Sequence, residues 1–324
     1  MSDVRLWVLC PCYNDVPAFT ILRNRVLEII DQTTSMQRTM VRFVVVDDTA
    51  GRNRDVAQLK ATDDTTVITP PFNLGHQRAI VYGLRMILPD LDDSDLIVTM
   101  DADGEDRPED VPRLLEPLLE ADDDYQAVCV ARRTKRSESF GFKVMYTVFR
   151  TMFRGLTGTT VRSGNFAAYR GFLARRILQH PYFDLCYSST LVSLDLDINP
   201  VPCERGTRYA GHSRMNLLRL IMHGVRMLMP FTDRIAVRAL IAFSSIFGLG
   251  LLLALAVVAI RVFTDAAIPG WTTFTLLGIL LLSFVALGNF VVLFAVFSHS
   301  RGLSLANLEE WNGRRAGSTS ASAD

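Results

Sequence analysis

Short apolar runs alternate with segments of helical periodicity over about the first 130 residues. Apolar runs without a helical period lie at 6–10, 41–46, 67–68, 96–100 and 127–130, and amphipathic patterns lie at 19–31, 55–60 and 77–87, with another beginning at Pro108. Proline is favoured in the first turn of a helix. This alternation predicts a mostly parallel sheet with helices on both faces. In such a sheet, ligands bind at the carboxyl ends of the strands.

Two further stretches are amphipathic and basic. Residues 140–156 place aromatic and methionine side chains three and four positions apart, between Lys143, Arg150 and Arg154, and residues 215–231 carry Arg219 and His223 among apolar positions. Helices of this composition lie either in a membrane interface or against an ordinary core. The membrane alternative is favoured for the second stretch because a long apolar run follows it directly.

Residues 239–260 and 271–298 contain no charged side chain. Each run is long enough to cross a hydrocarbon layer of about 30 Å as a helix. We therefore expect transmembrane helices over 235–262 and 271–298. Asn289, in the second run, either bonds across the pair or is simply a tolerated polar residue.

Basic residues flank the two runs unequally. The connector offers mainly Arg261 and Asp265, whereas the outer ends carry Arg226, Arg234, Arg238, His299, Arg301, Arg314 and Arg315. Because Lys and Arg collect on the cytoplasmic side, this bias predicts a multi-pass protein of the inner membrane with both termini in the cytoplasm. We expect residues 302–324, rich in Ser, Ala and Gly, to form a partly disordered cytoplasmic tail.

Composition narrows the class of partner. The 324 residues include 34 acidic and 34 basic side chains, with the acidic ones crowded into the first 125 positions and Arg dominant from about 132 to 238. Nothing here suggests nucleic acid, while the basic second half suits phosphates or anionic lipid. The five cysteines show neither zinc spacing nor a dense disulfide pattern, and no secretory signal opens the chain, so we expect a reducing, cytoplasmic setting for the first domain.

Asp101 and Asp103 directly follow the apolar run 96–100. Two carboxylates at a strand end can bind a hard divalent metal that keeps open positions for phosphate oxygens. The alternative is a solvated Asp pair in a turn.

Polar residues also follow the other strands. Pro11 to Asp15 comes after the first strand, and Asp47 and Asp48 end the second. Asp48 is a candidate acceptor for a base or ribose, and Asp47 either shares that role or caps the following turn. Residues 73–75, Asn-Leu-Gly, precede a helix whose N-terminus can face a phosphate-bearing ligand.

Taken together, these motifs resemble the family 2 glycosyltransferases of GT-A fold. Within that family, they are similar to the polyprenyl-phosphate glycosyltransferases, which include dolichol-phosphate mannose synthase and bacterial undecaprenyl-phosphate glucosyltransferases. The resemblance covers nearly the whole chain. It rests on residues 11–15, 46–48, 73–75, 101–109 and 208–214, with Asp15 in place of the family's Glu and Arg214 in place of its Lys. It implies a Rossmann-like catalytic domain over 1–213 that includes an interfacial helix at 140–156, followed by a second interfacial helix at 214–234.

The resemblance also implies roles for single residues. It makes Asp101, Asp103, Arg132 and Arg208 catalytic, and it gives Mg²⁺ or Mn²⁺ the ligands Asp101, Asp103 and Glu105. The lipid phosphate would contact Arg132, Arg133, Arg136 and Ser163. The nucleotide sugar would contact Pro11, Tyr13, Asn14, Asp15, Asp47, Asp48, Asn73, Gly75, Asp101, Ala102, Asp103, Arg208 and Arg214. Asn165 and Ala167 depart from the family's Gly-Asp-Phe-Arg segment, which removes a carboxylate and a cation near the expected acceptor site.

The expected function is inverting transfer of a sugar from a UDP- or GDP-linked donor to a polyprenyl phosphate, at the cytoplasmic membrane face, for a cell-envelope glycan. Expected partners are the donor, the lipid acceptor, the bilayer, a flippase, a downstream glycosyltransferase and further copies of the chain. A processive polysaccharide synthase is disfavoured, because two spans are too few for a polymer channel and the Gln-x-x-Arg-Trp signature is absent. A non-catalytic nucleotide-binding scaffold is disfavoured by Asp101, Asp103 and Arg208, while Asn165 and Ala167 leave it open.

Overall fold

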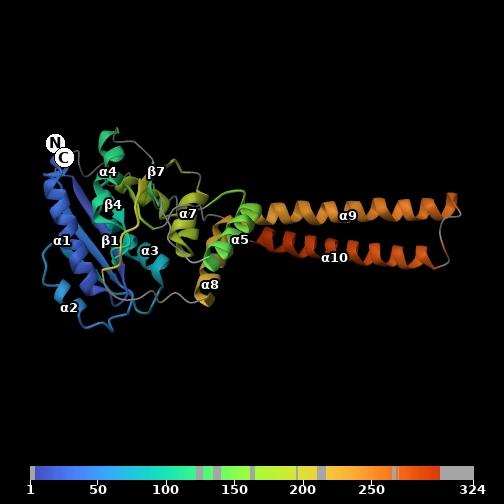
Figure 1. Cartoon of the computed structure of the whole chain (residues 1–324), viewed down its shortest axis with the longest axis horizontal. Helices are drawn as coiled ribbons and strands as arrows, with labels where there is room; N and C mark the ends of the chain where they lie inside the picture. The colour runs from blue at the N-terminus through green and yellow to red at the C-terminus, as the bar shows by residue number, and fades with distance from the viewer. Residues whose placement is uncertain are drawn as a thin grey trace, which may run out of the picture. The chain divides into compact units, whose positions relative to one another are not determined.

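The computed structural model describes residues 4–121, 127–133, 140–160, 165–194, 196–209, 217–264, 268 and 270–299. Its contacts divide these residues into two compact units. Among the described residues, the first unit extends to Phe149 and continues over Thr160–Pro230, and the second comprises Arg150–Thr159 and residues 231–299. Each unit has its own architecture (Figure 1).

A seven-stranded mixed sheet forms the centre of the first unit. Its strands are β1 (Arg5–Cys12), β2 (Met40–Asp47), β3 (Thr65–Ile68), β4 (Leu96–Thr99), β5 (Val128–Arg133), β6 (Ala167–Arg170) and β7 (Ile198–Cys203). They lie in the order β3-β2-β1-β4-β6-β5-β7. Only β6 runs antiparallel to its neighbours, β4 and β5. The expected mostly parallel sheet is therefore confirmed.

Helices cover both faces of this sheet. The α-helices are α1 (Val16–Gln32), α2 (Val56–Leu59), α3 (His76–Ile87), α4 (Val111–Glu120), α6 (Gly171–Ile177), α7 (Tyr187–Ser193) and α8 (Leu217–Leu228), while α5 (Phe140–Thr157) extends across both units. Short 3-10 turns lie at Thr34–Met36, Leu88–Asp90, Pro108–Asp110, Pro181–Asp184 and Met229–Phe231. The elements expected from the apolar pattern are present, and β6, α6, α7 and β7 add to them.

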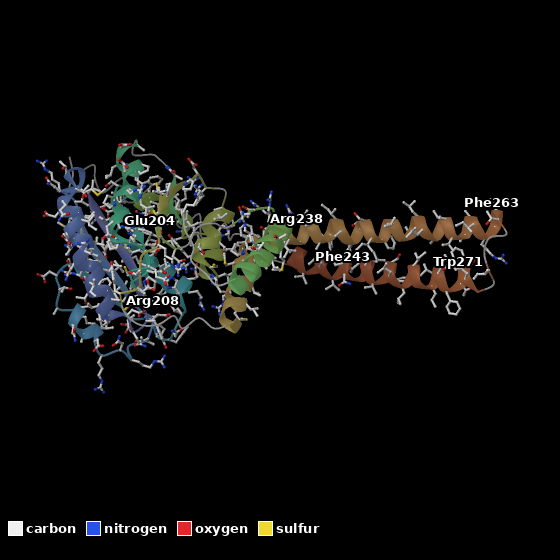
Figure 2. The ribbon with its side chains drawn as sticks, in the orientation of Figure 1. Glu204, Arg208, Arg238, Phe243, Phe263 and Trp271 are labelled. Atoms are coloured by element: carbon white, nitrogen blue, oxygen red, sulfur yellow. The ribbon has the colours of Figure 1, made fainter. Side chains whose placement is uncertain are left out.

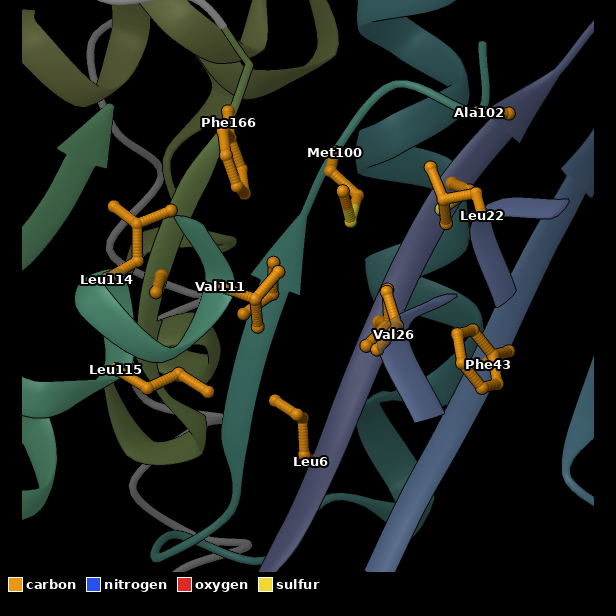
Figure 3. Packing of buried hydrophobic residues seen from close by; sticks show 14 of the residues in the cluster. Leu6, Leu22, Val26, Phe43, Met100, Ala102, Val111, Leu114, Leu115 and Phe166 are labelled. Carbon is orange, nitrogen blue, oxygen red and sulfur yellow. The ribbon is translucent and has the colours of Figure 1, made fainter. Parts of the chain in front are cut away.

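Two apolar cores lie between the sheet and its helices. On one face, α1 and α4 bury residues at spacings of three and four, such as Leu22 and Val26, against the strands. Figure 3 shows these two side chains beside Phe43 of β2, with Leu114 and Leu115 of α4 in the same layer. On the opposite face, α3, α6 and α7 form the second core. The sheet is thus buried on both sides, which leaves the strand ends to carry the chemistry.

The second unit contains two long helices, α9 (Thr232–Phe263) and α10 (Trp271–His299). Both are long and apolar enough to cross a membrane. Their outward side chains are largely apolar, as Figure 2 shows between Phe243, Phe263 and Trp271. Gly250 lets the helices approach closely, since an added Cβ would lie 2.2 Å from Ser283 Oγ. These helices are the candidate transmembrane hairpin.

Polar groups in the second unit bond mainly within or beside their own helices. Asn289 Nδ2 donates to Val285 O, 2.8 Å away on the same helix. This geometry corresponds to the tolerated-residue alternative rather than to a bond across the pair. Arg238 Nη1 donates to Gly155 O at 2.6 Å, near the end of α5, where helix carbonyls lack partners.

Candidate active site

The strand order brings three chemistry-bearing segments to one edge of the sheet. β1 lies between β2 and β4, so the chain segments that follow these strands become neighbours. Asp48 N donates to Cys12 O at 2.9 Å, and Met100 N donates to Leu9 O at 3.1 Å. Residues 11–15, 47–48 and 100–103 therefore gather at the carboxyl end of the sheet, where open α/β folds bind ligands.

The loop after β4, residues 101–106, is called the acidic loop here. It is paired with the segment after β7. Tyr209 N donates to Asp103 O at 2.8 Å, and Gly206 N donates to Glu105 O at 2.9 Å. Gly104 has φ +89°, and a Cβ there would lie 2.6 Å from the Tyr209 ring. Glycine is needed at this position because only glycine adopts such a conformation without strain, and because no space remains for a side chain. This pairing brings the arginines of the second segment to the acidic loop.

Arg208 and Arg205 hold the two carboxylates of the loop. Arg208 Nη2 lies 2.7 Å from Asp103 Oδ2 and 3.4 Å from Glu105 Oε1. Arg205 Nη2 lies 2.6 Å from Glu105 Oε2. Figure 2 labels Arg208 at this place in the first unit. Burial and the neighbouring Asp101 carboxylate raise the pKa of Asp103, while the Glu105 N–H and Arg208 act in the opposite direction. The cluster concentrates charge where a phosphate-bearing ligand could replace side-chain partners.

Asp101, Asp103 and Glu105 supply carboxylate oxygens, the ligands that hard divalent cations take. The donor set therefore fits Mg²⁺ or Mn²⁺ in kind. Across the described ranges, however, no group of three or more His, Cys, Asp or Glu side chains is arranged to hold a metal ion. Arg205 and Arg208 contact the oxygens that a cation would need.

Asp47 and Asp48 are both buried, and both bind their own loops. Asp47 Oδ1 accepts from Thr49 N at 3.1 Å and from Thr49 Oγ1 at 2.6 Å, and Asp47 Oδ2 accepts from Gly51 N at 3.1 Å. Asp47 thus caps the turn that follows β2, which is the second of the two roles expected for it from the sequence. Asp48 accepts from Leu74 N at 2.6 Å and from Gly75 N at 3.1 Å. Asp48 and the 73–75 turn, both expected at the nucleotide, therefore hold each other in place.

Asp101 faces a second polar cluster, on the side of α3. His76 Nε2 lies 3.0 Å from Asp101 Oδ1, and Asn165 Nδ2 lies 3.4 Å from the same oxygen. Burial alone would lower the pKa of His76, but the Asp101, Asp106 and Asp103 carboxylates raise it above its usual value. Asn165, which departs from the family pattern, therefore lies beside the central carboxylate.

The position of Asn165 is fixed from two directions. Gln77 Nε2 donates to Asn165 Oδ1, and Gln77 Oε1 accepts from Ser188 N at 3.0 Å. Beneath it, Thr99 Oγ1 donates to Asn165 O at 2.6 Å and lies 2.9 Å from the Tyr187 hydroxyl. Burial raises the pKa of Tyr187 to about 12, so this phenol stays protonated. A buried network thus orients the amide toward Asp101.

The structure places the other expected residues as follows. Pro11 and Ala102 are buried, Tyr13 and Asn14 are exposed on the turn after β1, and Asp15 precedes α1. Arg132 is exposed on β5, two strands away from β4 in the sheet. The side chain of Arg133, together with Arg136, Ser163 and Arg214, lies outside the described residues.

Sequence reasoning did not select His76, Gln77, Arg205 or Asp106. Asp106 is buried and its Oδ2 accepts from Asp101 N at 2.9 Å, which fixes the backbone of the acidic loop. His76 directly follows Gly75 and begins α3. Its place in the first turn of a helix expected beside the strand ends was the signal that could have selected it. Arg205 is three residues before Arg208, and nothing in the sequence alone shows that it reaches Glu105.

A family comparison agrees with this arrangement. The model of the family described as glycosyl transferase family 2 matches residues 7–178, which is more than half of the chain. The chain belongs to glycosyl transferase family 2. The expected GT-A type of α/β fold is accordingly confirmed, and the matched residues contain β1 to β4 with the acidic loop that follows β4.

Individual relatives in this family align over most of the chain. The uncharacterized glycosyltransferase YkcC of Bacillus subtilis is 24% identical over 296 residues, 88% of this chain and 87% of the relative. An undecaprenyl-phosphate 4-deoxy-4-formamido-L-arabinose transferase of Proteus mirabilis is 27% identical over 297 residues, 87% of this chain and 85% of the relative. Among solved structures, mannosyl-3-phosphoglycerate synthase of Rubrobacter xylanophilus is similar with a TM-score of 0.48 and 14% identity, over 71% of this chain and 74% of that one.

Proposed function

We propose that this family 2 glycosyltransferase moves a sugar from a nucleoside diphosphate sugar to a polyprenyl phosphate. The observation that carries the proposal is the cluster of Asp103, Glu105 and Arg208 at the carboxyl end of β4, beside Asp101. The similarity over 87% of this chain to a transferase named for undecaprenyl phosphate supports a lipid-phosphate acceptor. The candidate membrane helices support the same acceptor class.

A phosphate monoester acceptor does not need the enzyme to activate it as a nucleophile. Its second ionisation lies near pH 6, so near neutral pH it is already largely a dianion. Its oxygen can attack the anomeric carbon without a general base, and a single displacement inverts that centre. The larger tasks are alignment of the two substrates and stabilisation of the departing nucleoside diphosphate.

We assign those tasks to the residues at the strand ends. Asp103 and Glu105, with Asp101 beside them, would hold Mg²⁺ or Mn²⁺. When bound, the cation neutralises charge on the diphosphate leaving group. Arg208 and Arg214 would bind the same diphosphate once Arg208 leaves the carboxylates. Residues 11–15 and the loops that contain Asp48 and Asn73 would shape the pocket for the nucleoside.

The acceptor would approach from the membrane. Its phosphate would contact Arg132, Arg133, Arg136 and Ser163. We propose that α9 and α10 span the inner membrane, that both termini and the catalytic unit are cytoplasmic, and that α5 and α8 lie in the interface. The nucleotide sugar would then reach the active site from the cytoplasm.

Membranes that contain the full chain test this proposal directly. They are incubated with undecaprenyl phosphate and a panel of labelled UDP- and GDP-sugars, and the products are partitioned between water and chloroform. A chloroform-soluble labelled product supports the proposal. An insoluble polymer would indicate a processive synthase instead, and donor binding without product would indicate a scaffold. Chelation of divalent metals should stop the transfer, and added Mg²⁺ or Mn²⁺ should restore it.

A further inference from the structure

Helix α8 presents two different faces. Ile221, Met222 and Val225 are 54%, 47% and 47% exposed, and at about 100° per residue they lie on one side of the helix. His223 and Arg226, three positions apart, share the adjacent side. The helix therefore offers an exposed apolar surface directly beside a basic one.

The basic side of α8 lies at the start of α3. A Cβ built on Gly75, the residue before α3, would lie 3.9 Å from Arg226 Nη1. Burial lowers the pKa of His223, and the nearby charges of His76 and Arg226 lower it further. Three basic side chains from two helices thus converge at the first turn of α3. The acidic neighbours are Asp48, which accepts from Gly75 N, and Asp101, which pairs with His76.

Arg226 has no counterion in the part of the chain that the structure describes. It forms neither a hydrogen bond nor an ion pair there, whereas Arg208 and Arg205 are paired with carboxylates. An arginine that has no partner among the described residues and lies beside a helix N-terminus suits a phosphate, because guanidinium binds phosphate oxygens bidentately and the helix end favours negative charge. The site lies on the His76 side of Asp101, and Arg208 pairs with the neighbouring Asp103.

We propose that Arg226 and His223 bind the phosphate of the polyprenyl acceptor, and that the apolar face of α8 receives the first isoprene units. This inference rests on the proposed function, and it names an acceptor site in addition to the arginines that follow β5. A phosphate held at Arg226 reaches the donor from the His76 side of Asp101, and a chain leaving along Ile221, Met222 and Val225 stays in contact with apolar surface. One helix would then bind both parts of an amphipathic substrate.

The same phosphate chemistry could come from a membrane headgroup. Arginines also collect on the cytoplasmic side of membrane helices without binding a specific ligand. Arg234 provides the matched control, because it is also basic, is exposed at the start of α9 and lies close to the apolar span. Its guanidinium lies 5.8 Å from the Phe231 ring. A general membrane effect should be the same at both positions.

The kinetic test compares Arg226→Ala, Arg226→Lys and Arg234→Ala in the full chain. Loss of a charge-assisted contact to phosphate should raise the KM for undecaprenyl phosphate about tenfold or more in Arg226→Ala. The KM for the nucleotide sugar should stay unchanged, Arg226→Lys should recover part of the affinity, and Arg234→Ala should behave as wild type. Equal effects in both alanine variants, or no effect in Arg226→Ala, would overturn the proposal.

A binding test does not depend on turnover. Purified wild type and Arg226→Ala in detergent are titrated with undecaprenyl phosphate, undecaprenol and inorganic phosphate, and their binding to phosphatidylglycerol vesicles is compared. We expect wild type to bind undecaprenyl phosphate more tightly than either part alone, and the variant to lose that preference. Equal binding by both proteins, or a loss seen only with phosphatidylglycerol vesicles, would overturn the site. If wild type binds undecaprenyl phosphate through Arg226 but transfers no sugar from any donor, the proposed function fails while this site stands.

A substitution on the other face tests the apolar half of the site. Val225→Ser should raise the KM for undecaprenyl phosphate but leave the KM for ethyl phosphate, a monoester without an isoprene unit, almost unchanged, because ethyl phosphate has no isoprene chain to place on α8. An equal change for both acceptors, or no change for either, would show that this face does not contact the lipid.

Discussion

At the scale of single residues, the acidic loop depends on its arginines. Asp103 and Asp101 lie close enough to raise the pKa of Asp103, and Arg208 opposes that effect. Asp103 could be recognised from its place after an apolar run. Its partner Arg208 is more than a hundred residues away in sequence, and only the resemblance to a family suggested it. The sequence shows residue types but not which charges meet.

Replacement of Arg208 should therefore affect activity far more than stability. Arg208→Ala removes a cation that faces Asp103 and, in our account, later the diphosphate, so we expect kcat/KM to fall at least about 100-fold. Arg107→Ala is the matched control, because Arg107 forms an exposed pair with Glu204 (2.7 Å) and such pairs contribute little. Steady-state kinetics check both variants. Near-wild-type activity in Arg208→Ala would remove Arg208 from the mechanism.

Gly104 should tolerate no side chain. Gly104→Ala combines a conformation that costs about 1–3 kcal/mol for a non-glycine residue with a clash against Tyr209, so the loop should separate from residues 205–209. We expect loss of donor binding, measured by calorimetry with the nucleoside diphosphate. Gly51→Ala, which also has positive φ but whose Cβ would meet only Thr69 at 3.6 Å, should lose stability and keep donor binding. Equal donor affinity in both variants would contradict this account of the loop.

At the scale of elements, prediction succeeded where an apolar or uncharged run was long and uninterrupted. β1, β2 and β4 are apolar runs, and α9 and α10 contain long uncharged stretches, so their positions follow from the sequence. β6 has four residues and α6 and α7 have seven each, too few for a period to show. The antiparallel direction of β6 could not be predicted either, because it depends on pairing with β4 and β5. The same region holds Asn165, whose contacts with Asp101 and Gln77 therefore came only from the structure.

The contact between α3 and the sheet depends on Gly83. A Cβ at this position would lie 2.6 Å from Val46 Cγ2 and 2.8 Å from Leu9 Cδ1. Gly83→Ala should therefore destabilise the first unit by about 1–3 kcal/mol despite the better helix propensity of alanine. Thermal unfolding measures the effect. Gly155→Ala, in a helix where an added Cβ would meet nothing within 4 Å, should be neutral or slightly stabilising. A Gly83→Ala protein as stable as wild type would show that α3 can shift away from the strands.

At the scale of the whole molecule, a donor in the cytoplasm requires one orientation of the chain in the membrane. The flanking arginines predict that the α9–α10 connector faces away from the cytoplasm. All five native cysteines are buried, so a single new cysteine can report accessibility. Ile268→Cys should react with a membrane-impermeant maleimide added outside intact cells, and Ser2→Cys should react only after lysis. Labelling in the reverse pattern would place the catalytic unit on the wrong side for a cytoplasmic donor.

We propose that the site built on the strand-end carboxylates catalyses transfer of a sugar to a lipid phosphate. The most direct measurement is formation of chloroform-soluble label from nucleotide sugar and undecaprenyl phosphate, by equal amounts of membrane-inserted wild type and Asp103→Ala. We predict product with wild type for at least one donor, and none with the variant under the same conditions. Equal product from the two proteins would contradict the account.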